Sequence, residues 1–331
     1  MTSTPGPTNL LEAIRATAEQ PTLEWARPAI PLTGGFWAQM WHVRLATDCP
    51  GLGGELVARV MPEPDVAARE TAVQAHLARS GYPTPIVRLA APPGPHLGRA
   101  WMLMDHAPGQ PLLTGLSGAA ALARLPRIAR ALPDQLAQHA AALHVVDPAP
   151  LCDAIDGTDL LIPLRERAVA IDRPDLISLA DHLDDSRPPP GRVVLCHGDL
   201  HPFNILTDPD GDTVLDWSAT RIADPAYDIA YTRLLLVHTP LSAPRPLRAA
   251  IAAAGRVLAH RFTATYNRTA SVPVDPDQLA WYTDLHALRV VTEVASWQAN
   301  GELAKHPGHP FLTLSPALTT RLRAHLDRRP R

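Results

Sequence analysis

The stretch LCHGDLHPFNILTDPDGDTVLDWSAT, residues 195–220, gathers five aspartates, two histidines and one asparagine between short apolar runs. These are side chains that bind metal ions and move protons, so the stretch is a candidate site of chemistry. Three kinds of site fit the residue types: a calcium loop, a zinc site and a phosphoryl-transfer loop.

The calcium hypothesis rests on Asp208, Asp210 and Asp212, which alternate like the first ligands of an EF-hand loop. An EF-hand also needs a glycine directly after the third acid and a glutamate that closes the loop. Thr213 and Ala219 occupy those two positions. The simpler prediction is a solvated hairpin turn, in which Asp-Gly supplies the turn between two short strands.

The zinc hypothesis rests on His197, Asp199 and His201, whose alternate spacing would aim three side chains the same way from an extended strand. Gly198 and Pro202 interrupt such a strand, and no further histidine cluster at ligand spacing accompanies them. A metal-dependent hydrolase is therefore only a third hypothesis.

The phosphoryl-transfer hypothesis uses more of the stretch. A kinase catalytic loop has His-Arg-Asp-Leu, three residues and Asn, followed by a metal-binding Asp on a later strand. Here Asp199 and Leu200 reach Asn204 at the same interval, and Asp216 follows the predicted hairpin. Asp199 would take the proton of an acceptor hydroxyl, while Asn204 and Asp216 offer the hard oxygen ligands that Mg²⁺ prefers.

The flanking sequence predicts the elements that must position these residues. Alternating and apolar runs predict five antiparallel strands before residue 107, with one helix among them that ends near Gly81. Another helix is expected at residues 9–20, and long Ala/Leu-rich stretches predict a mainly helical second half. The predicted strands lie in AIPLTGGFWAQMWHVRLA (two strands), GELVARVMP, TPIVRLAA and RAWMLMDH.

Composition limits the partners and the location. The chain has 331 residues, a formal net charge of −3 and no long basic stripe, which predicts neither nucleic acid nor membrane as a partner. Cys49, Cys152 and Cys196 form no CxxC pair, which favours a reducing, cytoplasmic location. No secretory leader or membrane span is expected, and the oligomeric state is left open.

Three motifs in order, HGDLHPFN, VLDW and DPAYDIA, resemble those of the aminoglycoside phosphotransferase family, which is similar to the choline kinases. The resemblance implies a catalytic Asp199, metal-binding Asn204 and Asp216, and an Asp228 that braces the catalytic loop together with His197. It also implies an α+β, bilobal protein-kinase-like fold. We expect a small five-stranded antiparallel lobe with one helix over residues 1–105, and a larger, mainly helical lobe over 106–331.

The N-terminal part departs from the family pattern. Gly34 and Gly35 would form the phosphate-covering turn, although a full G-x-G-x-x-G is missing and a plain hairpin turn explains them equally well. Arg59 stands where kinases carry a phosphate-binding lysine, and Glu70 in the next helix resembles its ion-pair partner; the alternative is a surface ion pair. The segment MLMDHAPGQP resembles the hinge that binds adenine, through Met104, Asp105, His106 and Ala107.

The predicted function is phosphoryl transfer from ATP, with Mg²⁺, to a hydroxyl of a small molecule. The alternative is a catalytically silent, kinase-like nucleotide-binding protein, which the irregular glycine turn and Arg59 would suit. The acceptor itself stays open. Spacing makes five residues of a C-terminal helix possible pocket residues, although a buried helix face explains most of them better: Trp281, Asp284, Leu285, Leu288 and Trp297.

Overall fold

The computed structural model describes residues 6–32, 38–46, 49, 51–113, 119–155, 157–238, 245–306 and 309–326. It is an α+β structure that divides into two compact units. The first unit comprises Met1–Thr114, Ala149–Ile155 and Phe203–Thr220. The second comprises Gly115–Pro148, Asp156–Pro202 and Arg221–Arg331. The stretch that carries the predicted chemistry is thus divided between both units.

A five-stranded antiparallel sheet forms the centre of the first unit, in the order β2-β3-β5-β7-β6. Its members confirm the five predicted strands. The middle strand β5 is almost wholly buried because it pairs with β3 on one side and β7 on the other. The strands are β2 Ile30–Leu32, β3 Gln39–Val43, β5 Leu56–Met61, β6 Val87–Ala91 and β7 Ala100–Asp105.

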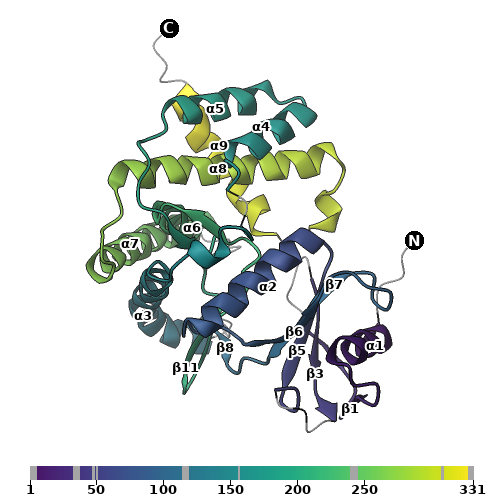
Figure 1. Cartoon of the computed structure of the whole chain (residues 1–331). Coiled ribbons are helices and arrows are strands. Elements are labelled where there is room, and N and C mark those ends of the chain that lie inside the picture. The colour runs from purple at the N-terminus through teal and green to yellow at the C-terminus, as the bar shows by residue number, and fades with distance from the viewer. Residues whose placement is uncertain are drawn as a thin grey trace. The chain divides into compact units, whose positions relative to one another are not determined.

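Two helices pack within this unit (Figure 1). Helix α2, Pro64–Arg79, begins with a proline that suits a first helical turn, and it contacts β5, β6 and β7. Helix α1, Pro7–Ala18, buries Leu10 and Ile14 in a core cluster with Trp101. A two-stranded sheet of β1, Glu24–Trp25, and β4, Leu45–Ala46, was not expected as a separate sheet.

A hairpin of β10, Ile205–Asp208, and β11, Gly211–Val214, completes the first unit together with β8, Gln110–Pro111. A short 3-10 helix, η1, covers Ala149–Leu151. The hairpin pairs Ile205 with Val214, so the residues just outside this pair, Asn204 and Leu215, face each other at its open end. The Leu215 amide donates to the Asn204 carbonyl there, with an N–O distance of 2.8 Å.

The second unit is mainly helical and has a large apolar core. A short sheet of β9, Val194–Cys196, and β12, Arg221–Ala223, lies in it. Helices α4, α5, α8 and α9 pack together (Figure 1), and α8 begins with an Asp275 cap that accepts from two backbone amides. No described helix has the length and apolar character needed to cross a membrane. The helices are α3 Ala119–Leu143, α4 Leu161–Ala170, α5 Pro174–Asp185, α6 Ala226–Val237, α7 Arg245–Thr269, α8 Pro276–Ala299, η2 Leu303–Lys305 and α9 Pro310–Leu326.

Candidate functional site

Asp228, in the first turn of α6, holds the backbone of the loop that follows β9. Its Oδ2 accepts the His197 amide and its Oδ1 accepts the Gly198 amide, each at 2.7 Å. Gly198 has a φ of 78°, a conformation that glycine adopts without strain. This places the backbone immediately before Asp199 in a fixed conformation. Asp228 thus bonds to the backbone of His197 and Gly198, next to Asp199, and the supporting role of Asp228 and His197 stays a prediction.

A chain of buried polar groups supports Asp228 in turn. The Nε2 of His144, just beyond α3, lies 3.2 Å from Asp228 Oδ2, and its Nδ1 lies 2.8 Å from the Tyr266 hydroxyl. Burial opposes the charged form of Asp228, but the hydrogen bond and charge of His144 outweigh it and hold the pKa of Asp228 below its usual value. The carboxylate is thus ionised in the interior at neutral pH.

Asp199 follows this loop with its side chain about one-third exposed. Its Oδ2 lies 3.5 Å from His201 Nε2, and the Tyr231 hydroxyl donates to it. Burial opposes ionisation, yet His201, followed by His197 and Arg289, holds the pKa of Asp199 below its usual value. An ionised, accessible carboxylate can accept a proton from a bound hydroxyl.

In the first unit, Arg59 on β5 contacts two acids that are far away in the sequence. Its Nη1 lies 3.4 Å from Glu70 Oε1, and its Nη2 donates to Asp216 Oδ1 at 3.2 Å, although Arg59 and Asp216 are 157 residues apart. Glu70 is 1% exposed and Arg59 is 11% exposed, so this is no surface ion pair. Burial works against the charged Arg59, but Glu70 and Asp216 more than offset it and raise the pKa of Arg59.

Asp216 has an uncommon backbone conformation, and only one of its two carboxylate oxygens accepts hydrogen bonds from the described residues. Its φ is 65°, which costs a non-glycine residue roughly 1 kcal/mol or more. The Ser218 hydroxyl donates to Oδ1 at 2.7 Å, the same oxygen that Arg59 contacts. Among the described residues, Oδ2 has no hydrogen-bond partner. Together with the Asn204 amide oxygen on the same hairpin, it fits the oxygen donors that Mg²⁺ takes.

Two further contacts fix the Asp216 loop, and no sequence pattern predicts either of them. Arg69 of α2 donates through Nη2 to the Ser218 carbonyl at 2.7 Å. The buried Trp217 donates through Nε1 to the Thr84 hydroxyl at 2.9 Å. These contacts hold the two residues after Asp216, Trp217 from a loop and Ser218 from a helix, which explains how the strained backbone of Asp216 persists.

The predicted hinge residues lie at the end of β7, where most backbone donors are already used. The Asp105 amide donates to the Ile86 carbonyl and the His106 amide to the Glu55 carbonyl. Arg88 binds the Asp105 carboxylate through two nitrogens, at 2.6 and 2.7 Å. Met104 is buried in a core cluster of the sheet. Within the described part of the chain, the Ala107 amide has no acceptor and is the one free donor of the three amides.

The predicted phosphate-covering glycines, Gly34 and Gly35, lie outside the described residues. The acids of the hairpin turn have structural roles. Asp208 Oδ1 accepts the amides of Asp210 and Gly211, at 2.8 and 3.0 Å, and Asp212 Oδ1 accepts the Thr207 hydroxyl at 2.6 Å. The geometry is that of a hairpin turn, as predicted, and not of a calcium loop.

The zinc hypothesis finds no support in the described residues. Among them, the one group of His, Cys, Asp and Glu atoms close enough for a shared ion is His144, Cys196 and Asp228. His197, Asp199 and His201 do not form such a group. The Asp228 oxygens already accept two amides, and burial raises the pKa of the Cys196 thiol well above its usual value, which keeps it protonated.

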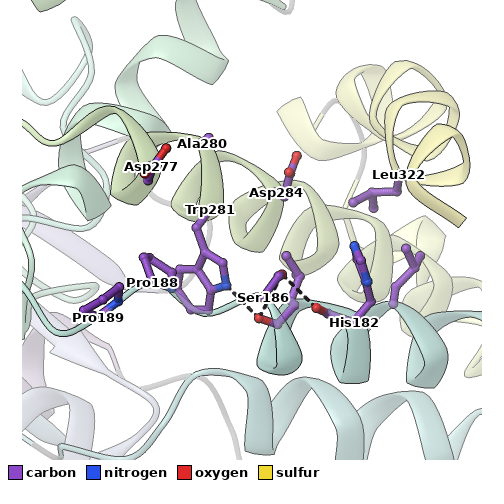
Figure 2. A pocket seen from close by; sticks show the side chains of 11 residues that line it. His182, Ser186, Pro188, Pro189, Asp277, Ala280, Trp281, Asp284 and Leu322 are labelled. Carbon is purple, nitrogen blue, oxygen red and sulfur yellow. Dashed lines mark hydrogen bonds between the residues drawn. The ribbon is translucent and has the colours of Figure 1, made fainter. Parts of the chain in front are cut away.

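The five helix residues suggested for an acceptor pocket do not form one. Leu285, Leu288 and Trp297 belong to the core of the second unit, as the alternative of a buried helix face predicted. Trp281 and Asp284 line a cavity of about 440 Å³ between α5, α8 and α9, and the Trp281 indole donates to the Leu183 carbonyl at 2.7 Å (Figure 2). Asp199 is not among the lining residues, so this cavity does not face the predicted base.

Residues 29–266 match the phosphotransferase enzyme family. The aminoglycoside 3'-phosphotransferase of Streptomyces fradiae is 30% identical over 197 residues, which cover 53% of this chain and 69% of that protein. The chain spans 20% of the length of the mouse acyl-CoA dehydrogenase family member 10, to which it is 26% identical over 220 residues, or 62% of this chain. It spans 33% of the length of a further bacterial relative.

Solved structures of low identity share the fold. A choline/ethanolamine kinase family protein from Mesorhizobium loti aligns with a TM-score of 0.62 at 15% identity, over 98% of this chain and 95% of that one. A thermostable mutant of an aminoglycoside phosphotransferase, in complex with ADP and hygromycin B, aligns with a TM-score of 0.59 at 16% identity, over 93% and 97%. The chain thus has a kinase-like phosphotransferase fold with antiparallel sheets.

Proposed function

Because the chain belongs to the phosphotransferase enzyme family, we propose that it moves the γ-phosphoryl group of ATP, with Mg²⁺, to a hydroxyl of a small molecule. The aminoglycoside phosphotransferase neighbour that was solved with ADP and hygromycin B supports a nucleotide and a small acceptor as the two substrates. The bilobal division at residues 105 and 106, and a cytoplasmic location, remain predictions of the sequence.

The observation that carries the proposal is the contact of Arg59 with both Glu70 and Asp216. A buried arginine that contacts both a glutamate able to orient it and a predicted metal-binding aspartate is expected of a phosphoryl-transfer site, where positive charge must face phosphate oxygens. A surface ion pair would not bury Glu70 to 1% exposure. A hydrolase would not need Arg59 in this place.

The residues divide the work as follows. Asp199 orients the acceptor hydroxyl and takes its proton, which its ionised state allows. Asn204 and Asp216 would hold Mg²⁺, and the bound ion supplies charge neutralisation of the phosphate oxygens. Arg59 binds phosphate oxygens, and Glu70 orients Arg59. His197 and Asp228 keep the backbone before Asp199 in place.

The nucleotide base is assigned to the end of β7. The Ala107 amide is free to donate to adenine, while Asp105 and His106 contribute backbone carbonyls because their amides are already bonded. Met104 forms part of the apolar surface under the base. Gly34 and Gly35 cover the phosphates in this proposal, as the family resemblance implies.

The test compares the purified wild-type protein with Asp199→Asn in a Mg·ATP turnover assay over a broad panel of hydroxylated acceptors. We expect the variant to lose at least about 100-fold in kcat, because the base is removed while the shape of the side chain is kept. Asp210→Asn, on the solvated turn, serves as the matched control and should keep full activity. Circular dichroism checks that each variant is folded.

Turnover that survives Asp199→Asn would refute the assigned base. Failure of the wild-type protein to phosphorylate any acceptor, combined with saturable ATP binding, would instead favour a catalytically silent nucleotide-binding protein.

A further inference from the structure

Basic groups of the second unit surround Asp199. The residues that act most strongly on its charge are His201, His197 and Arg289. His309, just before α9, lies within electrostatic range of both Asp199 and Arg289. Burial lowers the pKa of His309 and favours its neutral form. Arg289, on α8, is a permanent cation whose charge acts on the predicted base.

The Arg289 guanidinium is incompletely paired. Its Cζ lies 5.6 Å from the centroid of the Tyr231 ring, in a cation–π contact. Its Nη1 is buried and has no hydrogen-bond acceptor among the residues that the structure describes. Arg289 also forms no ion pair with a carboxylate of those residues. Since an arginine has five N–H donors and leaving one buried and unpaired is costly, this site lacks an acceptor.

The need to balance the charge of Asp199 does not account for Arg289. Asp199 already receives the Tyr231 hydroxyl and lies 3.5 Å from His201, and Arg289 acts on it through charge alone. Burial opposes the charged form of Arg289, but Tyr227, Tyr231 and Asp199 outweigh it and raise the pKa of Arg289, so the guanidinium stays charged. Burial, followed by the charge of Arg289, lowers the pKa of Arg167, whose partner is Glu293. An anion that reached Nη1 of Arg289 would supply the acceptor that the described residues do not provide.

We propose that Arg289 binds an oxyanion of the acceptor, a carboxylate or a phosphate, so that the acceptor is a hydroxylated acid. This inference rests on the proposed function and narrows its acceptor. In the transfer, the acceptor oxygen bonds to the γ-phosphorus, the bond from that phosphorus to the bridging oxygen breaks, and ADP leaves with the electron pair. The hydroxyl proton goes to Asp199.

A polycationic acceptor fits the same surroundings poorly. Ammonium groups brought beside a permanent, incompletely paired guanidinium would repel it, and like-charge contacts reduce affinity for the wrong partner. An oxyanion supplies the missing acceptor for Nη1 and can bind an arginine through two parallel hydrogen bonds. Charge thus selects among acceptors that all carry a hydroxyl.

The first experiment measures ADP release with Mg·ATP and four acceptor classes: hydroxycarboxylic acids, phosphorylated polyols, neutral polyols and aminoglycosides. We expect one of the two anionic classes to give the highest kcat/KM. The comparison of those two classes distinguishes a carboxylate from a phosphate as the group that Arg289 binds.

The second experiment tests Arg289 itself with the best acceptor. Arg289→Gln should raise the KM for an anionic acceptor about 10- to 100-fold, because a charged hydrogen bond is lost, and should leave the KM for ATP unchanged. Arg289→Lys should recover part of the loss. Arg173→Gln, which removes an arginine paired with Asp175 on the surface, is the matched control and should match the wild type.

Preference for aminoglycosides or neutral polyols would overturn the inference, as would an equal effect of Arg289→Gln on anionic and neutral acceptors. If no acceptor is turned over, the proposed function fails separately. Calorimetry with the same anionic compounds and a non-hydrolysable ATP analogue then decides the inference. Binding that Arg289→Gln abolishes supports the anion site, and absence of binding to the wild type refutes it.

Discussion

The two units each bury a carboxylate to the same extent and treat it in opposite ways. Glu70 in the first unit and Asp228 in the second are both 1% exposed. Burial raises the pKa of Glu70 to about 7, although Arg59 opposes this. The pKa of Asp228 is instead lowered, because the hydrogen bond and charge of His144 outweigh its burial.

Hydrogen-bond donors account for the difference. Asp228 accepts the amides of His197 and Gly198 at 2.7 Å and contacts His144. Glu70 has the Arg59 guanidinium at 3.4 Å as its main partner, and among the described residues neither of its carboxylate oxygens accepts a hydrogen bond. A buried carboxylate stays ionised when short donors surround it, and a single longer ion pair does not offset the loss of water.

The largest effect is expected for Asp228→Ala. The change leaves two buried amides and His144 without their acceptor, and we expect the free energy of unfolding to fall by about 3 kcal/mol or more. Urea unfolding at pH 7 measures this. Because the pKa of Asp228 is lowered in the folded state, its ionised form contributes to the free energy of unfolding. This contribution is fully present above the usual carboxyl range and is lost as pH falls through the folded pKa.

Asp228→Asn separates charge from shape, because it keeps one oxygen acceptor. It should be destabilised less than Asp228→Ala. A variant Asp228→Ala that unfolds at the wild-type urea concentration would show that the loop backbone does not depend on this carboxylate.

Glu70→Gln should give a smaller, pH-dependent effect of opposite sign. The pKa of Glu70 is raised to about 7 in the folded protein. The free energy of unfolding therefore falls progressively as the pH rises from the pKa of Glu70 in the unfolded chain toward 7. Between pH 5 and 7.5 the wild type should lose about 2 kcal/mol that the variant does not lose. Urea unfolding at both pH values measures the difference.

Glu63→Gln removes an exposed carboxylate just before the same helix and is the matched control. Equal pH dependence of the wild type and Glu70→Gln would contradict the assigned pKa.

Short-range patterns predicted much of this structure. The alternation in GELVARVMP and RAWMLMDH located two paired strands, β5 and β7, and the spacing of Val73 and Leu77 located the buried face of α2. The turn acids Asp208 and Asp212 were assigned by turn chemistry alone. These features depend on neighbours in the sequence, which is why a sequence pattern can contain them.

Contacts between distant segments were not predictable in the same way. Arg69 donates to Ser218 and Tyr231 donates to Asp199. Both contacts join segments that are far apart in the sequence, so no local pattern predicts them. Arg289 could not be identified from the sequence, because the spacing of apolar residues in its helix predicts only a buried face. The family motif HGDLHPFN contains Asp199 together with His197 and His201, while Tyr231 of α6 and Arg289 of α8, which also act on Asp199, lie outside the three motifs.

The smallest loss of stability is expected for Asp208→Ala, which tests whether burial of the carboxylate sets the size of the effect. Like Asp228, Asp208 accepts two backbone amides, those of Asp210 and Gly211, but it does so on an exposed turn. Water can replace the lost acceptor there, so we expect a loss of only about 1 kcal/mol in the free energy of unfolding. Asp210→Ala, whose side chain has no hydrogen bond among the described residues, should lose less still. A loss at Asp208 as large as that at Asp228 would show that donor number alone, and not burial, sets the cost.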